Sequence, residues 1–229
     1  MRLLFSPTSP YVRKVRVAVI EKGLEARIEL QPADVFGDEA TVAPINPLRK
    51  VPALILDSGE ALYDSPVICE YLDSLAPEPA LLPPGGPARW SVLRTQALAD
   101  GIADAGFNIV MERRRPEAQR SDEWQGRWRA AILRACAALD REAQGWDTAV
   151  DLGQIAAACA LGYVDFRLAE IDWRAGKAPW RPGSRKFRRV RAWPARRRQP
   201  HRRKNFLLRP GARGRRGLLA FADSAVWSC

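Results

Sequence analysis

Residues 50–65, KVPALILDSGEALYDS, place several structural signals in one short segment. Residues 53–56 are a continuous apolar run of the length of a buried strand. Residues 57–59, Asp-Ser-Gly, favour a hairpin turn, and residues 61–63 are suited to the partner strand. The Asp-Ser-Pro that follows is a helix start, and we expect this helix to run over 64–75. The segment therefore predicts a β-β-α unit.

The residues before this segment predict a β-α-β unit. A short apolar strand over 3–5 leads through Ser-Pro-Thr-Ser-Pro into an amphipathic helix over 12–22, which Gly23 ends. Residues 26–30 alternate apolar and polar side chains, the period of a strand. Together the two units predict a small α/β domain of the thioredoxin kind over 1–76.

The residues after it predict a second, all-helical domain. Five prolines and two glycines between Pro77 and Pro87 mark a linker. Helical domain 88–180 follows, with helices expected over 88–114, 122–144 and 152–168. Asp151 and Gln154 have the spacing of a capping box for the last helix. The interior of that helix is apolar on nearly every side, which is typical of a helix at the centre of a bundle.

The net charge of +11 comes from the end of the chain. Residues 181–229 hold 16 Lys and Arg against one acid, Asp223, so the first 180 residues carry a net charge of −4. This basic tail has no apolar period, and its Arg, Pro and Gly content is that of an out-of-frame reading. We expect the tail to be disordered or the product of a frameshift, and the alternative is a basic arm for an acidic partner.

The cysteine and histidine content restricts the chemistry. The four cysteines, at 69, 136, 159 and 229, show no paired spacing, as in proteins of a reducing compartment. The single histidine, His201, argues against a His-ligated metal site or a His-based triad. No apolar run approaches the roughly 20 residues of a membrane helix. We expect a cytoplasmic protein without a metal, a prosthetic group or a membrane partner.

This arrangement and its motifs resemble the cytosolic glutathione S-transferases, in particular the bacterial YibF-like branch. The resemblance covers about residues 1–180. It is carried by four elements: residues 8–14 (TSPYVRK), residues 50–54 (KVPAL), Asp64-Ser65, and Ala157 to Tyr163 in the last helix. It implies a thioredoxin-like domain followed by an all-α domain, glutathione as co-substrate, and a homodimer that detoxifies electrophilic small molecules. The family's short closing helix has no counterpart from Arg181 onward.

Ser9 is the expected catalytic residue. A free thiol has a pKa near 8.5, so glutathione needs help to become a thiolate at neutral pH. Ser9 stands at the start of the first helix, where a hydroxyl can donate to sulfur and the helix dipole favours an anion. The alternative role for Ser9 is that of a simple N-cap. Thr8 is the alternate catalytic hydroxyl, and Ser6 is also near this turn.

The resemblance also assigns the glutathione-binding residues. Val51 and Pro52, with Pro52 cis, would pair with the cysteinyl backbone, and the alternative is an ordinary trans proline at a strand edge. Asp64 and Ser65 would hold the γ-glutamyl end, or else only cap a helix. Lys50 is a candidate for the glycyl carboxylate.

Two further expectations concern more distant residues. Asp104 would reach the ammonium group of glutathione across a dimer, or lie on a solvated helix face. A second-substrate pocket is expected near Tyr11, Phe107, Met111 and Trp173, although such side chains are more often part of a core.

Three functions agree with these residues. The first is transfer of glutathione to an electrophile. The second is a glutathione-binding or protein-interaction module with little turnover. The third, nucleic-acid binding, is confined to the basic tail and is the least favoured.

Overall fold

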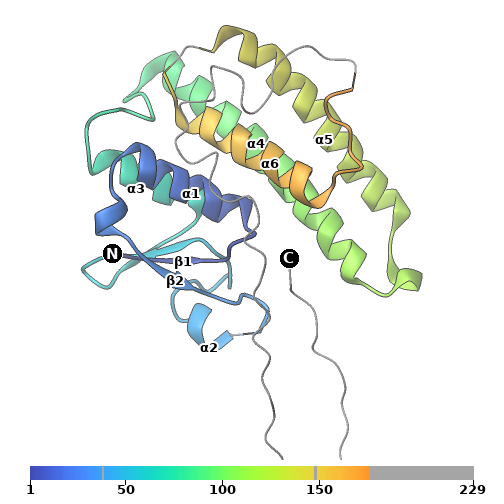
Figure 1. Cartoon of the computed structure of the whole chain (residues 1–229), viewed down its shortest axis with the longest axis horizontal. Coiled ribbons are helices and arrows are strands. Elements are labelled where there is room, and N and C mark those ends of the chain that lie inside the picture. Colours follow the sequence, from blue (N-terminus) through green and yellow to red (C-terminus); the bar gives the residue numbers. More distant parts are fainter. Residues whose placement is uncertain (38, 147–148, 176–229) are drawn as a thin grey trace, which may run out of the picture. The chain divides into compact units, whose positions relative to one another are not determined.

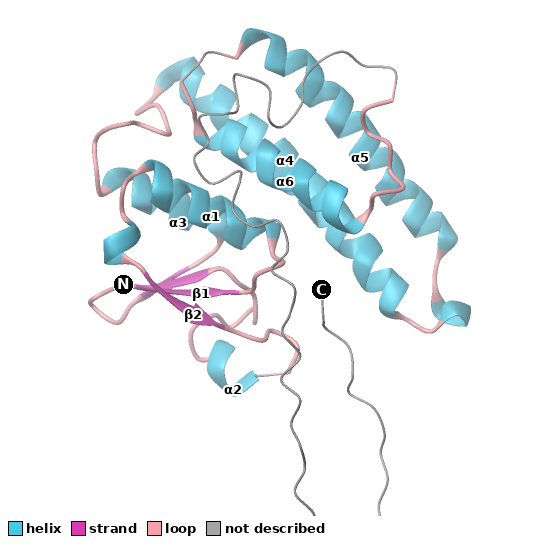
Figure 2. Ribbon diagram, in the orientation of Figure 1, coloured by secondary structure: helices cyan, strands magenta, loops and turns pink. Residues whose placement is uncertain are grey.

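The computed structural model describes residues 1–37, 39–146 and 149–175, and the predicted basic tail over 181–229 lies outside them. The described residues of the chain belong to one compact unit. Four strands and six α-helices make up these residues (Figures 1 and 2). No helix among them is long and apolar enough to cross a bilayer.

The sheet has the strand order β2-β1-β3-β4. Strand β1 (Arg2–Phe5) runs parallel to β2 (Glu29–Pro32) and antiparallel to β3 (Ala53–Ile55), which pairs in turn with β4 (Ala61–Leu62). The predicted hairpin is therefore confirmed. The second strand lies further along the chain than expected, because a 3₁₀ turn over Glu25–Arg27 occupies the start of the expected strand.

Successive residues of β1 point to opposite faces of the sheet, as the pleat requires. Leu3 packs with helices α1 (Pro10–Glu21) and α3 (Ser65–Ser74). Leu4 packs in a smaller cluster with residues of the segment that follows β2. That segment contains a short helix, α2 (Glu39–Val42), which the sequence analysis did not predict. Helices α1 and α3 lie together above the sheet in Figure 1, and α2 lies below it.

The helical part consists of α4 (Gly86–Arg114), α5 (Asp122–Glu142) and α6 (Leu152–Arg167). Helix α4 begins inside the expected linker because proline is tolerated in the first turn of a helix. Asp151 caps α6 by accepting the Gln154 N–H at 2.8 Å, as the sequence predicted. Helix α6 is buried along almost its whole length and packs against both α1 and α4.

One apolar core connects the sheet to the helical part. Leu3 and Val15 share a cluster with Leu152 and Ile155 of α6. Asp73 of α3 adds a polar connection: it pairs with the buried Lys22 at 2.7 Å, and it accepts the backbone N–H groups of Leu81 and Leu82. These contacts hold the Pro-rich segment against α1 and α3.

Candidate functional site

The register of the sheet brings three predicted segments to the same end. Leu4 pairs with Ala53, so the turn that follows β1 lies beside the residues that precede β3. Leu54 pairs with Leu62, so the residues after β4 continue past the start of β3. In antiparallel pairs this arrangement places the end of one strand next to the start of its partner. Ser9, Val51-Pro52 and Asp64-Ser65 therefore share one edge of the sheet, together with the N-termini of α1 and α3.

Ser9 is the N-cap of α1. Its Oγ accepts the Val12 N–H at 3.3 Å, and its carbonyl accepts the Arg13 N–H. A serine hydroxyl has one donor and two acceptor positions, so capping does not use the Oγ proton. The capping role and a donor role toward sulfur are compatible at this position. Thr8, the alternate hydroxyl, lies one residue outside the cap.

The Val51–Pro52 peptide bond is cis, as the resemblance implied, and both residues are buried. The turn before them is organised by Asn46, which the sequence analysis did not single out. Asn46 is buried, donates from Nδ2 to the Lys50 carbonyl at 2.9 Å, and accepts the Leu48 N–H at 3.0 Å. The signal that could have revealed it is an Asn two residues before a turn N–H, the pattern of an Asx turn.

Asp64 is the N-cap residue of α3, yet its carboxylate makes no capping hydrogen bond. Asp64 is exposed and Ser65 is buried, with 2% of its surface accessible. Among the described residues no side chain pairs with the Asp64 carboxylate. The simple capping role is therefore not observed for Asp64, and the first turn of α3 is left without a side-chain cap. Lys50 is exposed at the same edge.

Tyr11 and Asp104 meet within the chain, because the Tyr11 hydroxyl donates to Asp104 Oδ1. Burial, and then this hydrogen bond to Asp104, raise the pKa of Tyr11 well above its usual range. Tyr11 is thus a neutral phenol whose proton is donated to the Asp104 carboxylate of α4. In the structure Asp104 contacts Tyr11 of its own chain. Its contact with glutathione on a partner subunit stays a prediction.

The other residues predicted for a second-substrate pocket separate into two groups. Phe107 is 37% exposed and Met111 is half-buried, and both follow Asp104 on one side of α4 at helical spacing. Trp173 is 7% exposed and belongs to the helical core, where its indole N–H donates to Asp165 Oδ1 at 2.9 Å. The pocket assignment for Trp173 was wrong, because its ring is buried in the helical core and its indole N–H bonds to Asp165 near the end of α6.

A buried ion pair near the site was missed from the sequence. Lys14 is 1% exposed and pairs with both oxygens of Asp100 at 2.7 Å, which ties α1 to α4. Cys69 and Cys159 are buried thiols that form no disulfide, as the absence of paired spacing predicted, and burial raises the pKa of each to about 12. Cys136, the third cysteine of the described residues, is also buried.

Comparisons with known proteins agree with this arrangement. The family model described as the glutathione S-transferase N-terminal domain matches residues 3–80. The uncharacterized GST-like protein YibF of Escherichia coli K12 is 39% identical over 170 residues, which are 73% of this chain and 83% of that protein.

Solved structures give the same result. A glutathione transferase family member from Pseudomonas fluorescens Pf-5, with bound glutathione, has 42% identity and a TM-score of 0.74, covering 76% of this chain and 87% of that chain. A Methylobacterium radiotolerans glutathione S-transferase in complex with glutathione sulfonate has 37% identity and a TM-score of 0.74, covering 84% and 91%.

Proposed function

Because this chain belongs to the glutathione S-transferase family, we propose that it transfers glutathione to an electrophilic small molecule. In this reaction the glutathione thiolate attacks the electrophile, a carbon–sulfur bond forms, and a leaving group departs or an acceptor double bond takes up a proton. The glutathione-bound relatives support the first half of the proposal, which is the binding of glutathione.

The observation that carries the proposal is the position of Ser9. Its Oγ accepts from the first turn of α1, which aims the hydroxyl at the positive end of that helix while its proton stays available. Lowering the pKa of a bound thiol by two units corresponds to about 2.7 kcal/mol of thiolate stabilisation. A hydrogen bond to a charged group contributes about 1.5–3 kcal/mol, so one hydroxyl donor supplies much of this amount.

The remaining contacts of glutathione follow from the shared sheet edge. The backbone of Val51, next to the cis bond, would pair with the cysteinyl residue. The uncapped start of α3 at Ser65 suits the γ-glutamyl carboxylate, and the exposed Asp64 suits its ammonium group. Lys50 is the cation for the glycyl carboxylate. The protein would work as a homodimer in the cytoplasm, with Asp104 near the glutathione of the partner subunit.

Ser9→Ala tests the role of the hydroxyl. We expect kcat/KM toward a neutral aromatic electrophile such as 1-chloro-2,4-dinitrobenzene to fall at least tenfold, while the affinity for glutathione changes by only a few-fold. Thr8→Ala is the matched control, because it removes a hydroxyl one residue outside the cap. Full activity in Ser9→Ala together with a loss in Thr8→Ala would move the catalytic role to Thr8.

A glutathione-binding module with little turnover is the competing function. Calorimetry and steady-state kinetics on the same preparation separate the two. Tight binding of glutathione without turnover of several electrophile classes would favour the binding module and reject the transfer reaction.

A further inference from the structure

Phe36 is an exposed aromatic residue that the segment after β2 holds outward. It is 54% exposed, whereas its neighbours Ala33 and Val35 pack against the cluster that contains Leu4. Asp34 Oδ1 accepts the Phe36 N–H at 2.9 Å, which makes an Asx turn. The packing on one side and the turn on the other therefore fix the position of Phe36.

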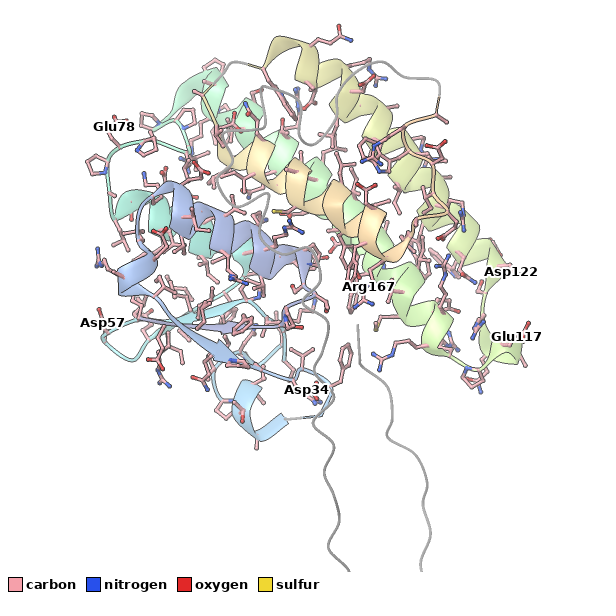
Figure 3. The ribbon with its side chains drawn as sticks, viewed as in Figure 1. Asp34, Asp57, Glu78, Glu117, Asp122 and Arg167 are labelled. Carbon is pink, nitrogen blue, oxygen red and sulfur yellow. The ribbon has the colours of Figure 1, made fainter. Side chains whose placement is uncertain are left out.

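The Phe36 ring contacts the last residue of α4. The Arg114 guanidinium lies over the ring, 4.7 Å from its centroid, which is the geometry of a cation–π contact. Arg114 Nη1 also donates to Met111 Sδ at 3.9 Å, so the guanidinium turns back along α4. In Figure 3 the labelled Asp34 and the end of α4, just before the labelled Glu117, lie along the lower side of the view.

This contact starts from the sheet edge of the candidate site. Strands β1 and β2 run parallel, so the segment after β2 leaves the sheet at the same edge as the turn that carries Ser9. The Ala33 N–H donates to the Phe5 carbonyl at 2.9 Å, which keeps the two segments together. The hydrogen bond from Tyr11 to Asp104 also joins this edge to α4. The sheet edge therefore reaches α4 at two places.

The two contacts bound one length of α4. Residues 104, 107, 111 and 114 follow one another at spacings of three and four, so their side chains lie along one face of the helix. Ten residues of helix span about 15 Å. Phe107, which is 37% exposed, and the half-buried Met111 lie between the two contacts. A single aromatic ring fits within this length, whereas two linked rings reach the contact of Phe36 with Arg114.

We propose that the contact of Phe36 with Arg114 limits the size of the second substrate. While it is formed, the ring and the guanidinium close the far end of the face that Phe107 and Met111 provide. An exposed cation–π contact is weak, so it opens readily, but only a long electrophile has to break it. The protein therefore selects compact electrophiles over extended ones. This inference rests on the proposed transfer reaction, which places the second substrate between Ser9 and α4.

Two electrophiles that differ only in length, together with their glutathione conjugates, test this selectivity. 4-Chloro-3-nitroacetophenone and 4-chloro-3-nitrobenzophenone react at the same carbon and carry a methyl or a phenyl group on the ketone. Their products are S-(4-acetyl-2-nitrophenyl)glutathione and S-(4-benzoyl-2-nitrophenyl)glutathione. Calorimetry on the full-length protein gives the ratio of the two conjugate affinities. In Phe36→Ala and in Arg114→Gln we expect this ratio to shift about two- to fivefold toward the benzoyl conjugate, the factor that loss of one exposed cation–π contact allows.

Three further variants show whether the effect comes from the contact itself. The double variant Phe36→Ala/Arg114→Gln should give the same ratio as either single variant, because each removes the same contact. Arg114→Lys keeps a cation and should give an intermediate ratio. Arg127→Gln is the matched control, because Arg127 makes the same kind of contact with Trp124 inside α5, at 5.4 Å. It should leave the ratio unchanged.

An unchanged ratio in both Phe36→Ala and Arg114→Gln would overturn the inference. So would a shift toward the acetyl conjugate, because the two side chains would then bind the longer group rather than exclude it. Turnover of the two chloro compounds, compared as kcat/KM divided by the uncatalysed rate constant, separates this inference from the proposed function. The expected shift in conjugate binding with no turnover of either compound would reject the transfer reaction and support the size limit. Turnover of both compounds with a ratio that no variant changes would reject the size limit alone.

Discussion

At the scale of single residues, the start of α3 contains an exposed carboxylate that caps nothing. We expect Asp64→Ala and Ser65→Ala to weaken glutathione binding at least fivefold, because both groups face the γ-glutamyl end of the ligand in our proposal. The pKa of the bound thiol should change little, since this end lies far from sulfur. Calorimetry measures the affinity, and ultraviolet absorbance of the thiolate measures the pKa. Unchanged affinity in both variants would remove these residues from the site.

At the scale of elements, the buried pair of Lys14 and Asp100 holds α1 against α4. Removing one partner leaves an uncompensated buried charge, which costs about 3–5 kcal/mol, whereas an apolar pair of similar volume is often neutral. We therefore expect Asp100→Leu to lower the free energy of unfolding by about 3–5 kcal/mol. The double variant Lys14→Met/Asp100→Leu should recover most of that loss. Urea denaturation measures both values, and equal losses in the single and double variants would contradict this account.

The connection between α4 and α5 makes a contribution to stability that depends on pH. Glu112 accepts the Ser121 backbone N–H at 2.8 Å, and this bond, followed by the nearby Arg115, holds the pKa of Glu112 below its usual value. A carboxyl with a lowered pKa stabilises the fold above its unfolded pKa, near 4.3, and loses this contribution as the pH falls through the folded value.

Glu112→Gln should therefore lower the Tm at pH 6–7, and the difference from the unmodified protein should shrink below about pH 4. Melting curves from pH 3 to 7 measure this difference. The exposed Glu117, five residues further along in a 3₁₀ segment, is the matched control. A Tm difference for Glu112→Gln that stays constant over the whole pH range would contradict the assignment.

At the scale of the whole molecule, the sheet and the helical part share one core. We expect the described part of the chain to unfold in a single transition for this reason. Five tryptophans, at 90, 124, 128, 146 and 173, lie in the described residues after the sheet, and none lies in residues 1–76, so the change in tryptophan fluorescence does not report on the sheet. Hydrogen exchange at β1 and β3 follows the sheet. The two midpoints in urea should coincide, and a sheet that opens at lower urea would show that the halves unfold separately.

The sequence predicted the elements whose signals are local. The hairpin after Pro52, the cap at Asp151 and the apolar helix α6 were all confirmed, because each depends on residues that are adjacent or one turn apart. The start of β2 and the short helix α2 were missed, since their positions depend on pairing with β1 and on packing below the sheet.

The candidate site shows the same limit. Ser9 and Pro52 could be assigned from motifs, but their shared sheet edge becomes visible only in the register of three strands. The Tyr11–Asp104 and Lys14–Asp100 contacts join residues about 90 positions apart, and no local pattern in the sequence connects them. Trp173 was misplaced for a similar reason, because its burial depends on the way the chain turns after α6.

The burial of the cysteines has a consequence for how long such a protein would survive its own reaction. Reactive electrophiles alkylate any accessible thiolate, including those of the protein that handles them. Cys69 and Cys159 are shielded from solvent, and thiols with a pKa of about 12 are almost entirely protonated at neutral pH. Glutathione activated beside Ser9 would then be the dominant nucleophile near the incoming electrophile, and the protein would be spared self-inactivation at these positions over many turnovers.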